Sequence, residues 1–115
     1  MHEMGIAMRI VDIAKSAIPP EAKDRTVTAV TLRVGKLSAI VPESMRFCFT
    51  VVSRDTPLEG ARLDIEEIPV TAVCEDCHDD FTITGADFTC PKCKGPNLKI
   101  LTGRELTVAS IELSE

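Results

Sequence analysis

Tryptophan and tyrosine are absent from this 115-residue chain, and aromatic residues make up only 3% of it. Because 44% of the residues are hydrophobic, the predicted core is large and mainly aliphatic. Few aromatic side chains also leave few platforms on which single-stranded nucleic acid could stack. Basic residues are outnumbered, 13 against 18 acidic ones, and the net charge of -5 repels phosphate. A nucleic-acid-binding role is therefore disfavoured.

The sequence also has no long apolar run and no secretory signal pattern. No stretch reaches the roughly 18 apolar residues that a membrane-spanning helix needs. Five cysteines without an export signal favour a reducing cytoplasm, where disulfides are rare. Cys48 stands apart from the other four, on the apolar stripe of a predicted helix. We expect it to be a buried small hydrophobe and not a reactive thiol.

Two Cys-x-x-Cys motifs carry the strongest chemical signal. Cys74 and Cys77 are followed after twelve residues by Cys90 and Cys93. A two-residue spacer lets both thiolates of a tight turn point at one ion, so two such turns supply the four soft ligands of tetrahedral zinc. A thioredoxin-like redox role is disfavoured because no βαβ pattern surrounds either motif. Iron in a rubredoxin-like site is the alternative metal.

Four thiolates close the coordination shell, whereas catalytic zinc keeps an open position for water. The predicted zinc is therefore structural. His78, directly after Cys77, is the one nearby group that could exchange with a thiolate. An exposed loop histidine is the ordinary interpretation, and a pH-sensitive ligand exchange is the alternative.

The apolar periodicity predicts two helices. Ile6, Ile10 and Ile13 recur at helical spacing within residues 4–18, before Pro19 and Pro20 end the helix. The second helix begins near Pro42 and carries an apolar stripe of Met45, Cys48, Phe49 and Val52. We expect both helices to pack onto a sheet through these stripes.

Alternating β-branched and aliphatic residues predict strands at residues 27–34, 62–70, 98–101 and 105–113, with a bulge or bend before Pro69. The chain enters the cysteine region on one strand and leaves on another, which we expect to pair antiparallel. The prediction is an α+β fold with two helices on a small, mainly antiparallel sheet. Residues 1–70 plus 99–115 form the predicted α+β domain, and residues 71–98 form an inserted zinc ribbon.

The amino terminus offers a second set of metal donors. The free amine of Met1, the backbone nitrogen of His2 and its imidazole can close adjacent chelate rings around one metal. Glu3 adds a carboxylate or its own backbone nitrogen. Such planar nitrogen and oxygen donors suit Ni(II) or Cu(II), although a histidine near an N-terminus is ordinarily just solvated.

Several motifs follow one another in a distinctive order. They are Met1-His2-Glu3, Val34-Gly35-Lys36-Leu37-Ser38, Pro42-Glu43-Ser44-Met45-Arg46-Phe47, Thr56-Pro57-Leu58-Glu59-Gly60-Ala61 and the two Cys-x-x-Cys pairs. With these motifs the chain closely resembles, over essentially its whole length, the HypA/HybF family of hydrogenase-maturation nickel metallochaperones. The resemblance implies a nickel site at Met1, His2 and Glu3 and a zinc site at Cys74, Cys77, Cys90 and Cys93.

The resemblance further implies a carrier and not an enzyme. Its partners would be a hydrogenase-maturation GTPase and the hydrogenase large-subunit precursor, and some family relatives also serve urease maturation. Two other classes stay open at this stage. A zinc-ribbon adaptor would bind only protein and would need no free amino terminus. A hydrolase with an N-terminal metal lacks a convincing general base beyond Glu3.

Overall fold

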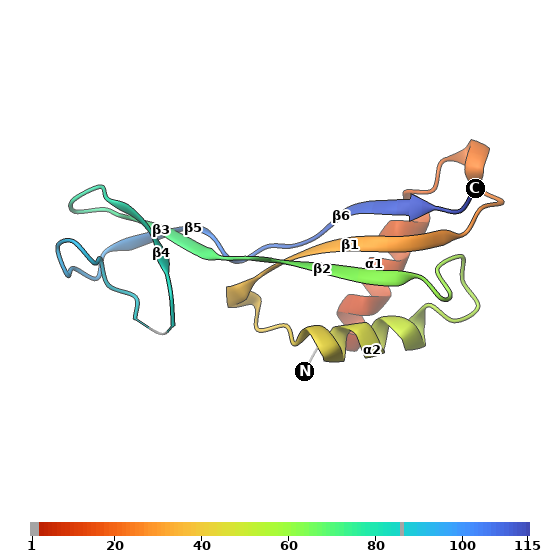
Figure 1. Ribbon diagram of the computed structural model, residues 1–115, viewed down its shortest axis with the longest axis horizontal. Helices are drawn as coiled ribbons and strands as arrows, with labels where there is room; N and C mark the ends of the chain where they lie inside the picture. Colours follow the sequence, from red (N-terminus) through yellow and green to blue (C-terminus); the bar gives the residue numbers. More distant parts are fainter. Residues whose placement is uncertain (1–2, 86) are drawn as a thin grey trace. The chain divides into compact units, whose positions relative to one another are not determined.

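The computed structural model describes residues 3–85 and 87–115 (Figure 1). The chain forms two compact units. The first, here called the body, comprises Met1–Arg33, Ile40–Glu66 and Thr107–Glu115. The second, here called the ribbon, comprises Val34–Ala39 and Glu67–Leu106.

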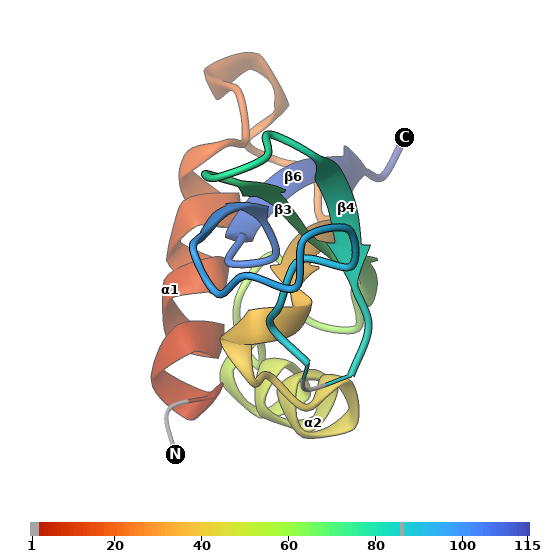
Figure 2. The same cartoon turned by 90° about the vertical axis from the view of Figure 1, so that its left-hand side faces the viewer.

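Two helices and one three-stranded sheet make up most of the body. The elements in this part of the fold are α1 (Glu3–Ser16), the 3-10 turn η1 (Pro20–Ala22), β1 (Val27–Gly35), α2 (Pro42–Val52), β2 (Arg62–Ile68) and β6 (Leu106–Leu113). The sheet has the order β2-β1-β6, and α1 and α2 pack against each other (Figure 1 and Figure 2). Because β1 is the central strand, most of its side chains are buried.

The face that α1 buries differs from the predicted stripe. Ile10 is buried as expected, but Ile13 is 49% exposed, so its assignment to the core is wrong. The buried side chains of α1 are Glu3, Ala7, Ile10, Val11 and Ala14. Two of these are alanines, which let the helix approach its neighbours closely. A prediction that weighs large aliphatic residues over alanine misplaces the contact face by about one residue.

Helix α2 follows its predicted pattern. Pro42 occupies the start of the helix, where its missing N–H is not needed. Met45, Cys48 and Phe49 are buried, which confirms the assigned face and the buried state of Cys48. Val52 is half-buried. The amide of Ser53 donates to the carbonyl of Phe49 at 3.0 Å and closes the last turn.

The strands of the body follow the sequence pattern. Strand β6 pairs with β1. Beside this pairing, the amide of Ser114 donates to the Thr26 carbonyl and the Thr28 hydroxyl donates to the Glu112 carbonyl. The predicted bend before Pro69 is confirmed, because the strand stops at Ile68 and a new one starts at Val70. Residue 69 is therefore where the chain leaves one sheet for the other.

The ribbon has a three-stranded sheet of its own. Its elements are the 3-10 turn η2 (Lys36–Ser38) and strands β3 (Val70–Cys74), β4 (Asp80–Ile83) and β5 (Leu98–Thr102), in the sheet order β4-β3-β5. β3 pairs antiparallel with both neighbours. The predicted pairing of strand 62–70 with strand 98–101 is wrong, because the first of these ends as β2 at Ile68 and lies beside β1, and the separate strand β3 pairs with β5 instead. With two helices and two small sheets, the α+β prediction is confirmed.

The ribbon's own hydrophobic core is small. Among the described residues, one cluster has Val70, Ala72 and Ile83 at its centre, with Phe81, Leu98 and Ile100 packed against them and only partly buried. Such a cluster is too small to stabilise an independent fold, so another source of stability is needed. Within the described residues, no helix is both long and apolar enough to cross a membrane.

Candidate metal centre

The two Cys-x-x-Cys motifs fold into turns with the same hydrogen bonds. In the first, the amide of His78 donates to the Cys74 carbonyl at 2.8 Å, and the amide of Cys77 donates to the Cys74 sulfur at 3.5 Å. In the second, the amide of Lys94 donates to the Cys90 carbonyl at 2.8 Å, and that of Cys93 donates to the Cys90 sulfur at 3.4 Å. Each motif is therefore a knuckle that directs both of its sulfurs the same way.

The four sulfurs converge on one point. The Sγ atoms of Cys74 and Cys93 lie 3.5 Å apart, as do those of Cys77 and Cys90, and all four lie within 4.8 Å of one another. No disulfide joins them. A tetrahedral zinc ion with bonds of about 2.3 Å would space its sulfurs by about 3.8 Å. The chain thus brings together all four predicted cysteines in a metal-binding cluster, and its spacing fits zinc.

The thiols of this cluster have opposed acidities. The backbone amide of Cys93 and then that of Lys92 lower the pKa of Cys90 to about 7, although burial opposes them. The backbone amide of Asp79 lowers the pKa of Cys77, but burial and the neighbouring sulfurs outweigh it and raise that pKa to about 12. The crowded sulfurs cannot all lose their protons without a cation between them. A bound dication would remove that conflict, because coordinated thiols are deprotonated.

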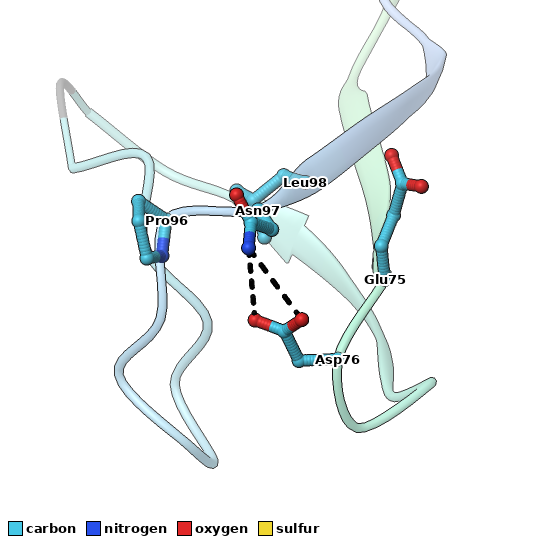
Figure 3. Close-up of a pocket in the computed structure, with 5 residues that line it drawn as sticks. All are labelled: Glu75, Asp76, Pro96, Asn97 and Leu98. Carbon is cyan, nitrogen blue, oxygen red and sulfur yellow. Dashed lines mark hydrogen bonds between the residues drawn. The ribbon is translucent and has the colours of Figure 1, made fainter.

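A polar contact ties the two knuckles together outside the cluster. Glu75, Asp76, Pro96, Asn97 and Leu98 line a hollow of about 400 Å³ (Figure 3). Across it the side-chain amide of Asn97 donates to the two carboxylate oxygens of Asp76, at 3.2 and 3.5 Å. The amide of Glu75 also donates to the Asn97 carbonyl at 2.8 Å. These bonds hold the first knuckle against the segment that follows the second.

His78 is exposed and does not belong to the group of mutually close donors, which in the described part of the chain contains the four cysteines alone. Its backbone φ is 63°, and that of Lys94, at the same position of the second knuckle, is 64°. Left-handed φ favours glycine and costs other residues about 1–2 kcal/mol. The position of His78 is therefore set by the knuckle, and its ring is left outside the cluster.

Replacing His78 by glycine is expected to stabilise the ribbon by about 0.5–1 kcal/mol. The relief of left-handed strain exceeds the extra unfolded-state entropy of glycine. The measurement is thermal unfolding of the zinc-loaded protein, with His78→Ala as the control that keeps the strain. A zinc coordination shell that changes with pH in the parent but not in the alanine variant would instead make His78 an exchanging ligand.

The second predicted site lies only partly within the described residues. Met1 and His2 fall outside them. Glu3 is the first residue of α1 and is only 5% exposed. Its carboxylate accepts hydrogen bonds from the amide of Val41 at 3.1 Å and from the hydroxyl of Ser44 at 3.4 Å. Sequence reasoning considered Glu3 only as a metal donor and missed this contact with α2.

A signal for that contact was present in the sequence. Helix α2 starts after Val41, whose side chain cannot accept a hydrogen bond, so its N-terminus needs a cap from elsewhere. Glu43 and Ser44 are the only polar side chains in its first turn. No rule of local spacing, however, selects a residue 38 positions earlier as the acceptor.

Comparison with known proteins gives one consistent result. Residues 1–113 match the family described as hydrogenase/urease nickel incorporation, metallochaperone, HypA. The chain is 61% identical, over its whole length and 88% of the relative, to the hydrogenase maturation factor HypA of Desulfatibacillum aliphaticivorans. It is 54% identical, over the whole of both chains, to that of Desulfosudis oleivorans.

The fold matches a solved structure as well. The solution structure of the Ni metallochaperone HypA from Helicobacter pylori aligns with a TM-score of 0.65 and 24% identity. The alignment covers 98% of this chain and 97% of that one.

An α+β body and a ribbon that gathers four cysteines define a small two-unit metal-binding protein. The full-length family match then identifies which kind of metal-binding protein this is. The chain belongs to the HypA family of nickel metallochaperones, which act in hydrogenase maturation and are not enzymes. The resemblance inferred from the sequence motifs is thereby confirmed.

Proposed function

We propose that this protein binds Ni(II) through Met1, His2 and Glu3 and delivers it to a hydrogenase precursor. The observation that carries the proposal is the family match over residues 1–113, which includes the amino-terminal chelate. The free amine, the residue-2 nitrogen and the imidazole form the planar donor set that Ni(II) accepts. An incomplete terminal chelate also suits a carrier, since a donor must be displaced for transfer.

The zinc ion is proposed to be structural and to reside in the ribbon. Cys74, Cys77, Cys90 and Cys93 would hold it and would leave no open position for a substrate. We assign the α+β domain predicted at residues 1–70 plus 99–115 to nickel handling, and the zinc ribbon predicted at residues 71–98 to stability and recognition. In this division the zinc ion replaces the large core that the ribbon lacks.

The proposed partners are a hydrogenase-maturation GTPase and the large-subunit precursor of a [NiFe]-hydrogenase. Delivery would take place in the cytoplasm, where the precursor is assembled. Urease maturation proteins are a further proposed partner class, because the family description names both hydrogenase and urease.

His2→Ala is expected to abolish Ni(II) binding while zinc content and thermal stability stay almost unchanged. Without the imidazole the terminus has no strong nitrogen anchor beyond its amine. Adding one residue before Met1 tests the amine separately, because the amine becomes an amide and the positively charged end moves away. The measurement is calorimetric titration of tag-free protein with nickel chloride, with the parent and both variants in parallel.

Equal nickel affinity in all three proteins would contradict the assignment of the terminus. A parent protein that retains zinc and binds the GTPase but never binds nickel would favour the second candidate, a zinc-ribbon adaptor. The observation that favours this second candidate is the distribution of charged residues on the ribbon. Its first knuckle carries Glu75, Asp76 and Asp79, and its second carries Lys92 and Lys94.

A further inference from the structure

The two knuckles of the metal centre are held to the ribbon in unequal ways. The first knuckle joins β3 to β4, and the amide of Cys74 donates to the Asp79 carbonyl at 2.9 Å, so both of its ends are fixed in the sheet. β4 ends at Ile83, and among the described residues no strand follows before β5. The bond from the Cys90 amide to the Gly95 carbonyl, at 2.9 Å, closes the second knuckle without joining it to the sheet. The orientation of the second knuckle therefore depends on how its C-terminal end is fastened.

Successive contacts fasten that end to the first knuckle. Leu98 lies opposite Cys74 in the register of β3 and β5. Beyond this pair, the amide of Glu75 donates to the Asn97 carbonyl at 2.8 Å and extends the pairing past the ends of the strands. The side-chain amide of Asn97 then donates to the Asp76 carboxylate, at 3.2 and 3.5 Å (Figure 3). This side-chain contact continues the pairing at the point where the backbone turns into the knuckles.

The Asp76 carboxylate also lies beside the second knuckle. A Cβ atom on Gly95 would lie 3.4 Å from Oδ2 of Asp76 and 3.3 Å from Sγ of Cys93. The carboxylate and the thiol therefore both approach the backbone directly after the second knuckle. Charge alone opposes this placement, because a zinc ion with four thiolate ligands is itself negatively charged. The hydrogen bond from Asn97 favours it.

We propose that Asp76 and Asn97 are positioning residues of the metal centre, which latch the second knuckle onto the first and slow the loss of zinc. The inference rests on the structural zinc site proposed above and deepens it. Neither side chain binds the metal, because in the described part of the chain the mutually close donors are the four cysteines. The latch keeps the sulfurs converged when one thiolate dissociates, so that this ligand rebinds before the zinc ion leaves.

The rate at which the zinc-loaded full-length chain gives up its metal to a chromogenic chelator measures the effect. Asp76→Ala and Asn97→Ala are each expected to release zinc about fivefold faster than the parent, the effect of one ordinary hydrogen bond. The double variant should be no faster than either single one, because both remove the same contact. Glu75→Ala is the matched control. It removes a carboxylate from the same hollow, and Figure 3 shows this side chain turned away from the latch, so its rate should equal the parent's.

Exchange of the two side chains separates the hydrogen bond from the charge. Asp76→Asn keeps an acceptor for the Asn97 amide and should release zinc no faster than the parent. Asn97→Asp brings two carboxylates face to face and should speed release more than about tenfold, because repulsion adds to the lost bond. Adding Asp76→Asn to Asn97→Asp restores one donor and one acceptor, and should return the rate to within about twofold of the parent.

Two further readouts distinguish a latch from a general loss of stability. Cobalt(II) in place of zinc should give the same tetrahedral thiolate spectrum in every variant, because the ligands are unchanged. Brief alkylation of the zinc-loaded protein with iodoacetamide, followed by mass spectrometry, should label Cys90 and Cys93 more in the latch variants than in the parent. Labelling of Cys74 and Cys77 should not change, because the first knuckle is fixed in the sheet at both ends.

Zinc release at the parent's rate in both Asp76→Ala and Asn97→Ala would overturn the latch. So would effects that add in the double variant, or an exchanged pair that is no slower than Asn97→Asp alone. A cobalt spectrum that changes in Asp76→Ala would make the carboxylate a ligand and overturn its positioning role. A parent protein that holds no zinc would overturn the proposed zinc site, whereas a zinc-loaded parent with unaltered variants overturns the latch alone.

Discussion

Replacing Cys90 with alanine is expected to release zinc and unfold the ribbon while the body keeps its helices. Cys90 is fully buried, and its sulfur lies 3.5 Å from that of Cys77. The three buried residues of the ribbon core cannot replace the metal. Structural zinc contributes about 10–16 kcal/mol of apparent folding free energy in small domains, far more than such a cluster supplies. Cys74→Ala should behave in the same way.

The body should stay folded in Cys90→Ala because its stability comes from contacts that do not involve the metal-binding cluster. Phe49, Leu32 and Met45 are fully buried there, and none of them belongs to the ribbon. Elemental analysis gives the metal content, and amide hydrogen exchange reports the two units separately. The ribbon amides should lose protection while those of α1 and α2 keep it.

Cys48→Ala is the matched control, because Cys48 is a buried cysteine outside the metal cluster. It should retain one zinc per chain and full ribbon protection, at the cost of a small packing loss. Iron in the purified parent, or a ribbon that stays protected in Cys90→Ala, would contradict the zinc assignment.

The metal-binding cluster was predictable because its signal is local. A two-residue spacer fixes the geometry within each knuckle, so the sequence names the four donors before any fold is known. The paired strands β3 and β5 then bring the second knuckle to the first. The small polar contact between Asp76 and Asn97 had no such pattern and was found only in the folded ribbon.

Helix α1 illustrates why the buried face of a helix was harder to predict than the metal-binding cluster. Its buried face runs through Glu3, Ala7, Ile10 and Ala14, a spacing typical of a helix contact. Hydrophobicity alone favours the isoleucines and rejects a glutamate at the end of the stripe. The burial of Glu3 depends on α2, because the N-cap residue Val41 has no capping side chain and its amide donates to the Glu3 carboxylate instead. A hydrogen bond between two helices cannot be predicted from the sequence of either helix by itself.

Replacing Gly35 by alanine is expected to cost more than about 4 kcal/mol, an exceptional loss for one methyl group. A Cβ atom there would lie 2.1 Å from both the carbonyl carbon and the oxygen of Gly103, and 2.5 Å from the nitrogen of Arg104. The overlapping atoms are backbone, so no rotamer change can relieve the clash. Nearby hydrogen bonds hold the two segments together, from the Leu37 amide to Gly103 at 2.8 Å and from the Gly35 amide to Glu105 at 2.7 Å.

The backbone at Gly103, which Gly35 approaches, is also tightly packed on its other side. Gly103 has a φ of 120°, and a Cβ on it would meet Val70 at 2.9 Å, so the segment cannot retreat from a new methyl group. Thermal unfolding should show a midpoint lowered by on the order of 10–20 °C.

Two glycines with open surroundings serve as controls. Gly5→Ala lies in α1 and should stabilise by about 0.5–1 kcal/mol, whereas Gly85→Ala, with φ 72°, should cost only the left-handed strain of about 1–2 kcal/mol. A Gly35→Ala variant no less stable than Gly85→Ala would mean that the two backbones can separate, and that their close approach does not stabilise the fold.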